Sequence, residues 1–335
     1  MKRIDDAKFR RALKALKGSQ PNLHELDRST RIELLRARRE FAAKLEALLP
    51  DRGELEKIDR ILKQSQARQL QILRKRTREM ARAQSALDGR SSSRATNRRT
   101  ALRVLSTPGM AFPPSYISLD PFLIWARPAN MLFDSRIGPS SSWAKISLED
   151  SIESFPGIPD FSFGFADLTF YYLWSNPSAY HAVVNARCDL AFRGSCQAVG
   201  DSGFLLGGNA KLDGYGVLRA LEWWNQPPTY GDGNELNFFM DLEGDGSGFW
   251  RFETGDVDFK NQFDPIDLRY DLFAIPPKGS AVFEVTVAFD YSLFNGGDVV
   301  IDFATLANYA VTCSSFQLEL LTAPVGPLDA TLENP

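Results

Sequence analysis

The stretch Ala281-Val282-Phe283-Glu284-Val285-Thr286-Val287-Ala288-Phe289-Asp290-Tyr291 decides the fold. Apolar residues occupy its odd-numbered positions, and the polar residues between them are Glu284, Thr286 and Asp290. This period of two predicts a β-strand with one buried and one wet face. Because a sheet with one apolar face must be covered, the stretch also predicts a second sheet packed against the first.

The same alternation recurs between Tyr116 and the C-terminus, with Gly, Pro, Asn and Asp separating the segments. Two of these breaks, Pro276-Pro277-Lys278-Gly279 and Asn295-Gly296-Gly297, are typical of turns. Short strands at this spacing favour an all-β sandwich or jelly roll. The predicted strands cover 121–126, 143–148, 163–174, 180–192, 195–199, 209–222, 235–242, 248–253, 268–274, 281–291, 298–304 and 309–321.

Charge is distributed unevenly along the 335 residues. Residues 1–104 contain 28 Lys and Arg against 13 Asp and Glu, a net charge of +15. The remaining residues contain 11 basic and 29 acidic side chains, a net charge of -18. This asymmetry predicts a basic arm or stalk attached to an acidic head.

The basic N-terminal region has helical periodicity. Apolar spacing predicts a short amphipathic helix over 4–17 and longer helices over about 30–49 and 54–87. Four Gln residues interrupt the apolar seam of the last one, so an antiparallel helical hairpin and a self-associating bundle both stay open. The predicted fold class is α+β in segregated domains, with a helical hairpin, bundle or coiled coil followed by a jelly-roll-like all-β sandwich.

Composition also divides the chain. Residues 1–88 are predicted to form a basic helical region, and 89–115 a flexible linker rich in Ser, Arg and Pro. A β-sandwich domain is expected over 116–323, followed by a C-terminal tail over 324–335. This organisation places the helices and the sandwich in separate parts.

Basic side chains concentrate towards the end of the helical region, which is the electrostatic signature of a phosphate-binding segment. The alternatives are contact with an anionic membrane surface, or with the acidic β domain of the same or a neighbouring chain. The candidate residues for nucleic acid or another polyanion are Arg74, Lys75, Arg76, Arg78, Arg82, Arg90, Arg94, Arg98, Arg99 and Arg103.

Signatures of catalysis are missing from the sequence. It contains only two histidines, His24 and His181, no Gly-x-Ser-x-Gly elbow, no phosphate-binding loop and no dinucleotide fingerprint. A zinc site would need a cluster of His or Cys, which the sequence does not contain. The protein is therefore predicted not to be an enzyme and to need no cofactor, with calcium as the one metal to consider.

Two stretches suggest ligand sites. In residues 241–248, the side chains of Asp241, Glu243 and Asp245 alternate before Gly246, as in oxygen-liganded calcium loops, although Phe252 stands where a twelfth-position acid would be expected. The other interpretation is a polar hairpin turn. Trp223 and Trp224 adjoin the turn 225–228, where a tryptophan could stack on a sugar ring. The alternative is that one of them packs in the core and the other seals a loop.

The three cysteines, Cys188, Cys196 and Cys313, are an odd number in a chain whose first residues are charged and not a secretory signal. Reduced thiols are expected. A hairpin at Arg193-Gly194 would place Cys196 opposite Ala191, so a bond to Cys188 is not predicted. No apolar run reaches the roughly 18 residues that a membrane span needs. The prediction is a protein that is cytoplasmic on synthesis, and then part of an assembled particle or exported without a signal.

Several segments resemble a group of uncharacterised bacterial proteins over about 120–322. They are Leu132-Phe133-Asp134-Ser135, Trp143-Ala144-Lys145-Ile146, Glu222 to Pro228, and Tyr270 to Pro277. The resemblance implies no activity and no catalytic residue. It favours a bacterial or phage-derived setting.

Three functions remain from these patterns. The leading prediction is a non-enzymatic, self-assembling structural or recognition protein, a homo-oligomer that displays an acidic β-sandwich head. The first alternative is a jelly-roll, capsid-like shell protein that binds nucleic acid through its Arg-rich segment. The third is a carbohydrate-binding or carbohydrate-active β-sandwich with a glycan partner.

Overall fold

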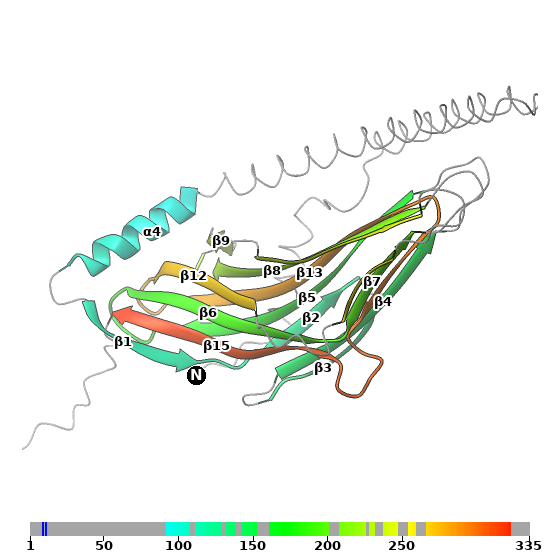
Figure 1. Ribbon diagram of the computed structural model, residues 1–335. Coiled ribbons are helices and arrows are strands. Elements are labelled where there is room, and N and C mark those ends of the chain that lie inside the picture. Colours follow the sequence, from blue (N-terminus) through cyan, green and yellow to red (C-terminus); the bar gives the residue numbers. More distant parts are fainter. Residues whose placement is uncertain are drawn as a thin grey trace, which may run out of the picture.

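The segment with the strongest alternation forms the central strand of a sheet. In the computed structural model, strand β13 (Ser280–Phe294) pairs antiparallel with β5 (Phe161–Ser175) on one side and with β8 (Asn209–Glu222) on the other. The strand order is β10-β8-β13-β5-β2, with β9 paired to β8 (Figure 1). The remaining strands of this sheet, called sheet B, are β2 (Leu123–Arg127), β9 (Thr229–Gly231) and β10 (Asn237–Asp245).

The structure describes residues 9, 11, 92–107, 111–128, 131–138, 142–152, 161–200, 208–225, 228–231, 237–246, 254–258 and 266–322.

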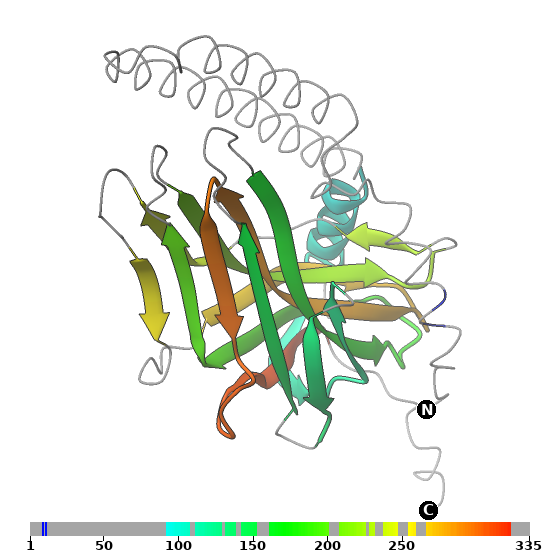
Figure 2. The same ribbon diagram turned by 90° about the vertical axis from the view of Figure 1, so that its right-hand side faces the viewer.

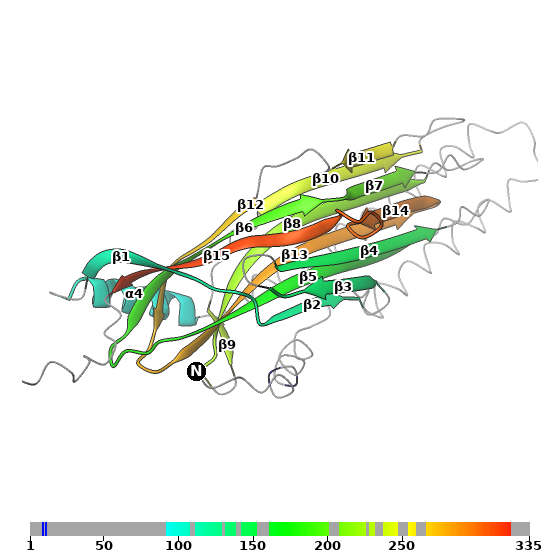
Figure 3. The same cartoon turned by 90° about the horizontal axis from the view of Figure 1, so that it is seen from below.

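The second sheet, called sheet A, has the order β11-β7-β14-β4-β15-β6-β12, with β1 paired to β15 and β3 paired to β4. Strands β6 and β7 follow one another along β15 and β14, so the chain runs on through Gly194 without reversing (Figure 3). The hairpin at Arg193-Gly194 that was considered for the pairing of Cys196 therefore does not form. Sheet A contains β1 (Ala111–Ser118), β3 (Leu132–Arg136), β4 (Ser142–Ile152), β6 (Ala182–Arg193), β7 (Ser195–Gly200), β11 (Thr254–Asp258), β12 (Ile266–Ile275), β14 (Gly297–Asp302) and β15 (Ala310–Thr322).

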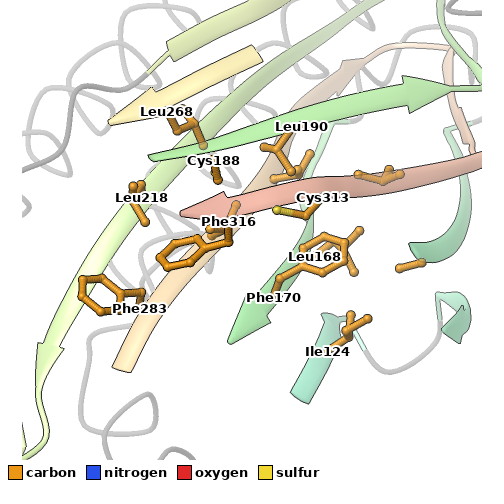
Figure 4. Close-up of a cluster of buried hydrophobic side chains, with 14 of the residues drawn as sticks. Ile124, Leu168, Phe170, Cys188, Leu190, Leu218, Leu268, Phe283, Cys313 and Phe316 are labelled. Atoms are coloured by element: carbon orange, nitrogen blue, oxygen red, sulfur yellow. The ribbon is translucent and has the colours of Figure 1, made fainter. Parts of the chain in front are cut away.

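The apolar faces of the two sheets form one continuous core. Phe283 of β13 packs against Phe316 of β15 and Phe273 of β12, so the core joins sheet B to sheet A (Figure 4). The predicted β-sandwich is confirmed. All three cysteines are free and buried, and burial raises the pKa values of the Cys188 and Cys196 thiols.

Helix α4 (Ser92–Leu105) lies along one end of the sandwich, beside β12 (Figures 1 and 2). Ala101 and Val104 are buried against Val183 and Ala274 of sheet A. The helix therefore forms in the segment that composition predicted as a flexible linker. Its apolar face is short, but the sheet supplies an apolar partner for it.

The predicted fold class of segregated helical and β domains was wrong. The part of the chain that the structure describes consists mostly of strands, and the one helix whose ends it contains, α4, packs on the sandwich and in no bundle or coiled coil. Apart from Phe9 and Arg11, the predicted helices over 4–17, 30–49 and 54–87 lie outside the described residues.

A search of the described residues finds no helix with the length and apolar character needed to cross a membrane.

Asn97 joins α4 to the outer strand β12. Its Nδ2 donates to the carbonyl of Ala274 at 3.0 Å, and its Oδ1 accepts from the amide of Ala274 at 2.7 Å. The side-chain amide thus satisfies both backbone groups of one residue on an edge strand, where unpaired groups invite association. The same Nδ2 also contacts Glu222 Oε1 at 3.2 Å.

Replacing Asn97 with alanine is expected to lower the free energy of unfolding by about 2 kcal/mol, because a partly buried donor and acceptor on β12 lose their partner. Arg98→Ala, an exposed change in the same helix, is expected to stay within about 0.5 kcal/mol of the parent. Urea unfolding of the full chain measures both. Equal effects of the two changes would show that the Asn97 contact does not stabilise the fold.

Candidate functional site

The outer face of sheet B carries the polar half of the alternation. On β13 the side chains that point away from the core include Glu284, Thr286 and Asp290. Residues directly opposite on antiparallel strands share a face, so the register sets their neighbours. Arg219 of β8 and Tyr171 of β5 flank Glu284. The neighbours of Thr286 and Asp290 are Val217, Thr169, Asp213 and Phe165.

Glu284 is a buried carboxylate on this face, with only 1% of its surface exposed. The Tyr230 hydroxyl of β9 donates to its two oxygens, at 3.2 and 3.3 Å. The Arg219 guanidinium lies 5.9 Å from the Tyr230 ring centre, a cation–π contact. Burial and the charge of Glu284 raise the pKa of Tyr230, which keeps its proton for this bond. This network joins β9 to β13, in addition to the backbone pairing of β9 with β8.

Aromatic rings close the same end of the face. The ring of Phe9 lies 4.8 Å from Phe122, 4.8 Å from Trp223 and 5.9 Å from Tyr171. Trp224 instead packs against the main core, 5.7 Å from Phe273. The two tryptophans predicted as ligand-stacking residues therefore pack in different hydrophobic clusters, Trp223 with Phe9 and Trp224 with the main core.

The middle of the face combines ions and hydroxyls. Arg127 of β2 forms an ion pair with Asp167 of β5, and its guanidinium lies 5.5 Å from the Phe165 ring centre. Thr169 and Thr286 share a hydrogen bond of 3.0 Å. This part of the face therefore offers donors and acceptors whose positions are held by their neighbours.

The other end of the face is more open and presents an aromatic pair. Phe238 of β10 is 66% exposed and its ring lies 5.9 Å from the Tyr215 ring. The Tyr215 hydroxyl donates to Asp290 Oδ2 at 3.1 Å. Burial and the charge of Asp290 raise the pKa of Tyr215, so its hydroxyl remains protonated. An exposed aromatic ring next to an oriented hydroxyl and carboxylate has the composition of a ligand-binding surface.

A charged cluster borders this aromatic pair. Lys211 Nζ lies 3.3 Å from Asp213 Oδ1 and 3.5 Å from Asp241 Oδ1. Burial raises the pKa of Asp213, and Lys211 opposes that rise. For Lys211, burial acts to lower the pKa, but the two carboxylates outweigh it and the pKa is raised. The ammonium group thus offsets part of the negative charge of the two acids.

The residues predicted as calcium ligands lie in strand β10, not in a loop. Asp241 pairs with Lys211, Glu243 accepts from Asn209 Nδ2 at 3.3 Å, and Asp245 stands opposite Asn209 in the register. Within the described residues, no group of three or more His, Cys, Asp or Glu side chains is arranged to hold a metal ion. Calcium binding stays a prediction.

Only some of the basic residues predicted to bind a polyanion lie in the described part of the chain. Arg94 lies in α4, and Arg98, Arg99 and Arg103 are exposed on the same helix. The others, Arg74, Lys75, Arg76, Arg78, Arg82 and Arg90, lie outside the described residues. Nucleic-acid binding is untested by this arrangement.

The sequence analysis named Glu284 and Asp290 only as polar positions of a strand and did not predict them, Tyr215 or Phe238 as functional residues. A usable signal was present in β8, where Lys211, Asp213, Tyr215 and Arg219 stand at outward positions of an alternating strand. The pairing of β8 with β10 and β13 was needed to bring these side chains together.

The sequence matches no protein-family model and no curated protein. Among solved structures, two carbohydrate-binding modules align with the chain. TmCBM61 in complex with beta-1,4-galactotriose shows 10% identity and a TM-score of 0.12, covering 59% of this chain and 97% of that one. TmCBM27, in a study of specific mannan recognition, shows 12% identity and a TM-score of 0.15, covering 56% of this chain and 98% of that one. At these scores the alignments carry no argument about function.

Proposed function

We propose that this protein binds carbohydrate, without catalysing a reaction, through the open end of the outer face of sheet B. The supporting observation is the exposed Phe238 ring beside Tyr215, whose hydroxyl is bonded to Asp290. Aromatic surface contacts the apolar face of a sugar, while ionised carboxylates accept hydrogen bonds from its hydroxyls. The Lys211 cluster and the ion-paired Arg127 add further polar groups.

The charges favour binding over glycoside hydrolysis. Hydrolysis uses one protonated and one ionised carboxyl group on either side of the glycosidic bond. Asp213 and Asp241 instead lie opposite each other on neighbouring strands, and both are paired with the same ammonium group, that of Lys211. This arrangement suits a charged recognition surface.

Phe238→Ala in the full chain is expected to weaken binding to the best polysaccharide of a panel of galactans, mannans and glucans by about tenfold or more, since a central aromatic contact is lost. Affinity electrophoresis selects the polysaccharide, and calorimetry with matching oligosaccharides measures the constant. Asp290→Asn is expected to weaken binding by a smaller factor, because Tyr215 loses an ionised acceptor.

Tyr116→Ala is the matched control. Tyr116 is also 66% exposed, but it lies on β1 of sheet A, so its removal is expected to leave binding unchanged. Trp223→Ala tests whether the tryptophan site predicted from the sequence, and not the surface around Phe238, binds the carbohydrate. If no carbohydrate of the panel binds, or if Phe238→Ala binds as well as the parent, the proposal is wrong.

A further inference from the structure

Strand β3 lies at the margin of sheet A, next to β4 (Figure 3). In the described part of the chain β4 is the only strand that pairs with it. Such an open edge presents unpaired backbone groups to any extended chain. The strand and Ile137, the residue that follows it, also expose apolar side chains, Leu132 on one face of the strand and Phe133 on the other. The exposed fractions are 59% for Leu132, 40% for Phe133 and 46% for Ile137.

Two exposed charges of opposite sign stand on one face of β3. Asp134 is opposite Lys145 and Arg136 is opposite Trp143, so both point to the outer face of sheet A. Lys145 donates instead to the carbonyls of Leu306 and Ala307, at 3.3 and 3.2 Å. Within the described residues, neither Asp134 nor Arg136 forms an ion pair. Each charge is therefore available to a partner.

The spacing of these charges selects one self-pairing register. When a sheet continues across a two-fold axis, antiparallel copies of a strand pair residues of the same face. A register centred on Asp134 or on Arg136 places like charges opposite each other. The register centred on Ser135 places Asp134 opposite Arg136 of the partner subunit, twice by symmetry. It also places Phe133 opposite Ile137 of the partner subunit.

We propose that two copies of this protein associate by antiparallel pairing of β3 with β3 of the partner subunit, with Ser135 at the two-fold axis. The partner is a second copy because β3 is complementary to itself in both charge and apolar contacts. The interface joins sheet A to sheet A, so it is independent of carbohydrate binding on sheet B. The association covers the apolar edge and places two carbohydrate-binding faces in one particle.

Charge exchange tests the register in the full chain. Sedimentation equilibrium is expected to show a dimer, and Asp134→Arg is expected to weaken it by about tenfold or more, since each change creates two like-charge contacts. The double variant D134R/R136D restores both ion pairs with reversed sign and is expected to recover most of the affinity. A monomer at every concentration, or a dimer that Asp134→Arg does not weaken, would overturn the proposal.

A disulfide at the two-fold axis provides an independent measurement. Directly opposite residues on paired strands lie within the Cα separation that a disulfide accepts. The three native cysteines are buried, so Ser135→Cys introduces a partly exposed thiol that is expected to crosslink two chains under mild oxidation. Ser151→Cys, an exposed change on β4, is expected to remain monomeric on a non-reducing gel. Equal crosslinking of the two variants would count against the proposal.

Discussion

Phe283→Ala is expected to lower the free energy of unfolding by about 3–5 kcal/mol, a large part of the stability of an ordinary domain. The Phe283 ring is fully buried and lies 5.4 Å from Phe316 and 6.0 Å from Phe273 (Figure 4). Its removal would leave a cavity between the two sheets, because rigid strands on both sides limit collapse. Urea unfolding of the full chain, followed by tryptophan fluorescence, measures the change.

The exposed Phe238 offers the same substitution as a control. Phe238→Ala is expected to change the free energy of unfolding by only about 0.5 kcal/mol, because that ring is already largely in water. The pair also separates stability from recognition, since Phe238→Ala should fold normally while losing carbohydrate affinity. Similar losses of stability for the two variants would show that Phe283 does not anchor the core.

Gly208→Ala is expected to destabilise the protein by about 3 kcal/mol or more, through overpacking. A Cβ atom at Gly208 would lie 1.4 Å from the carbonyl oxygen of Gly296. Gly208 also accepts a hydrogen bond of 2.8 Å from the amide of Gly246, so the backbone has little room to shift. Thermal unfolding of the full chain checks this expectation.

Gly216→Ala is the corresponding control in strand β8. The nearest atoms to its Cβ would be the Leu268 methyl groups, at 3.3 and 3.4 Å, and a leucine side chain can adjust. We expect a cost below about 1 kcal/mol. If the two glycine variants unfold at the same temperature, the close backbone approach at Gly208 does not control stability.

The glycines of 241–248 show how one pattern supports two explanations. In the sequence, alternating acidic residues followed by glycine suggest a loop that wraps around a cation. In the structure a Cβ at Gly244 would lie 2.4 Å from the carbonyl oxygen of Ala198, so this glycine permits strands β7 and β10 of the two sheets to approach. Glycine is required at position 244 because the backbone of the other sheet leaves no room for a side chain, and not because the chain turns there.

Local alternation was sufficient to predict the sandwich and most of its strands, but β1, β3, β9 and β11 were not predicted. The predicted strand 248–253 lies outside the described residues. The alternation in β13 and its neighbours is set by residues that lie two apart in the sequence. The apolar face that it creates must be covered by a second layer, wherever the strand lies in the sheet. The positions of the long strands therefore followed from nearby residues, although some ends differ, as in β4, predicted over 143–148 and observed over Ser142–Ile152. The predicted separate helical part failed because composition does not show where a helix packs.

Helix α4 and the binding face were decided by tertiary contacts. The helix depends on Val183 and Ala274, which lie about 80 and 170 residues from it in the chain and supply the apolar partner that its own sequence lacks. The outer face places Tyr215, Phe238 and Asp290 together only because β8 pairs with both β10 and β13. Each strand could pair with many others that are distant in the sequence, so the residues within a strand do not by themselves determine its partner.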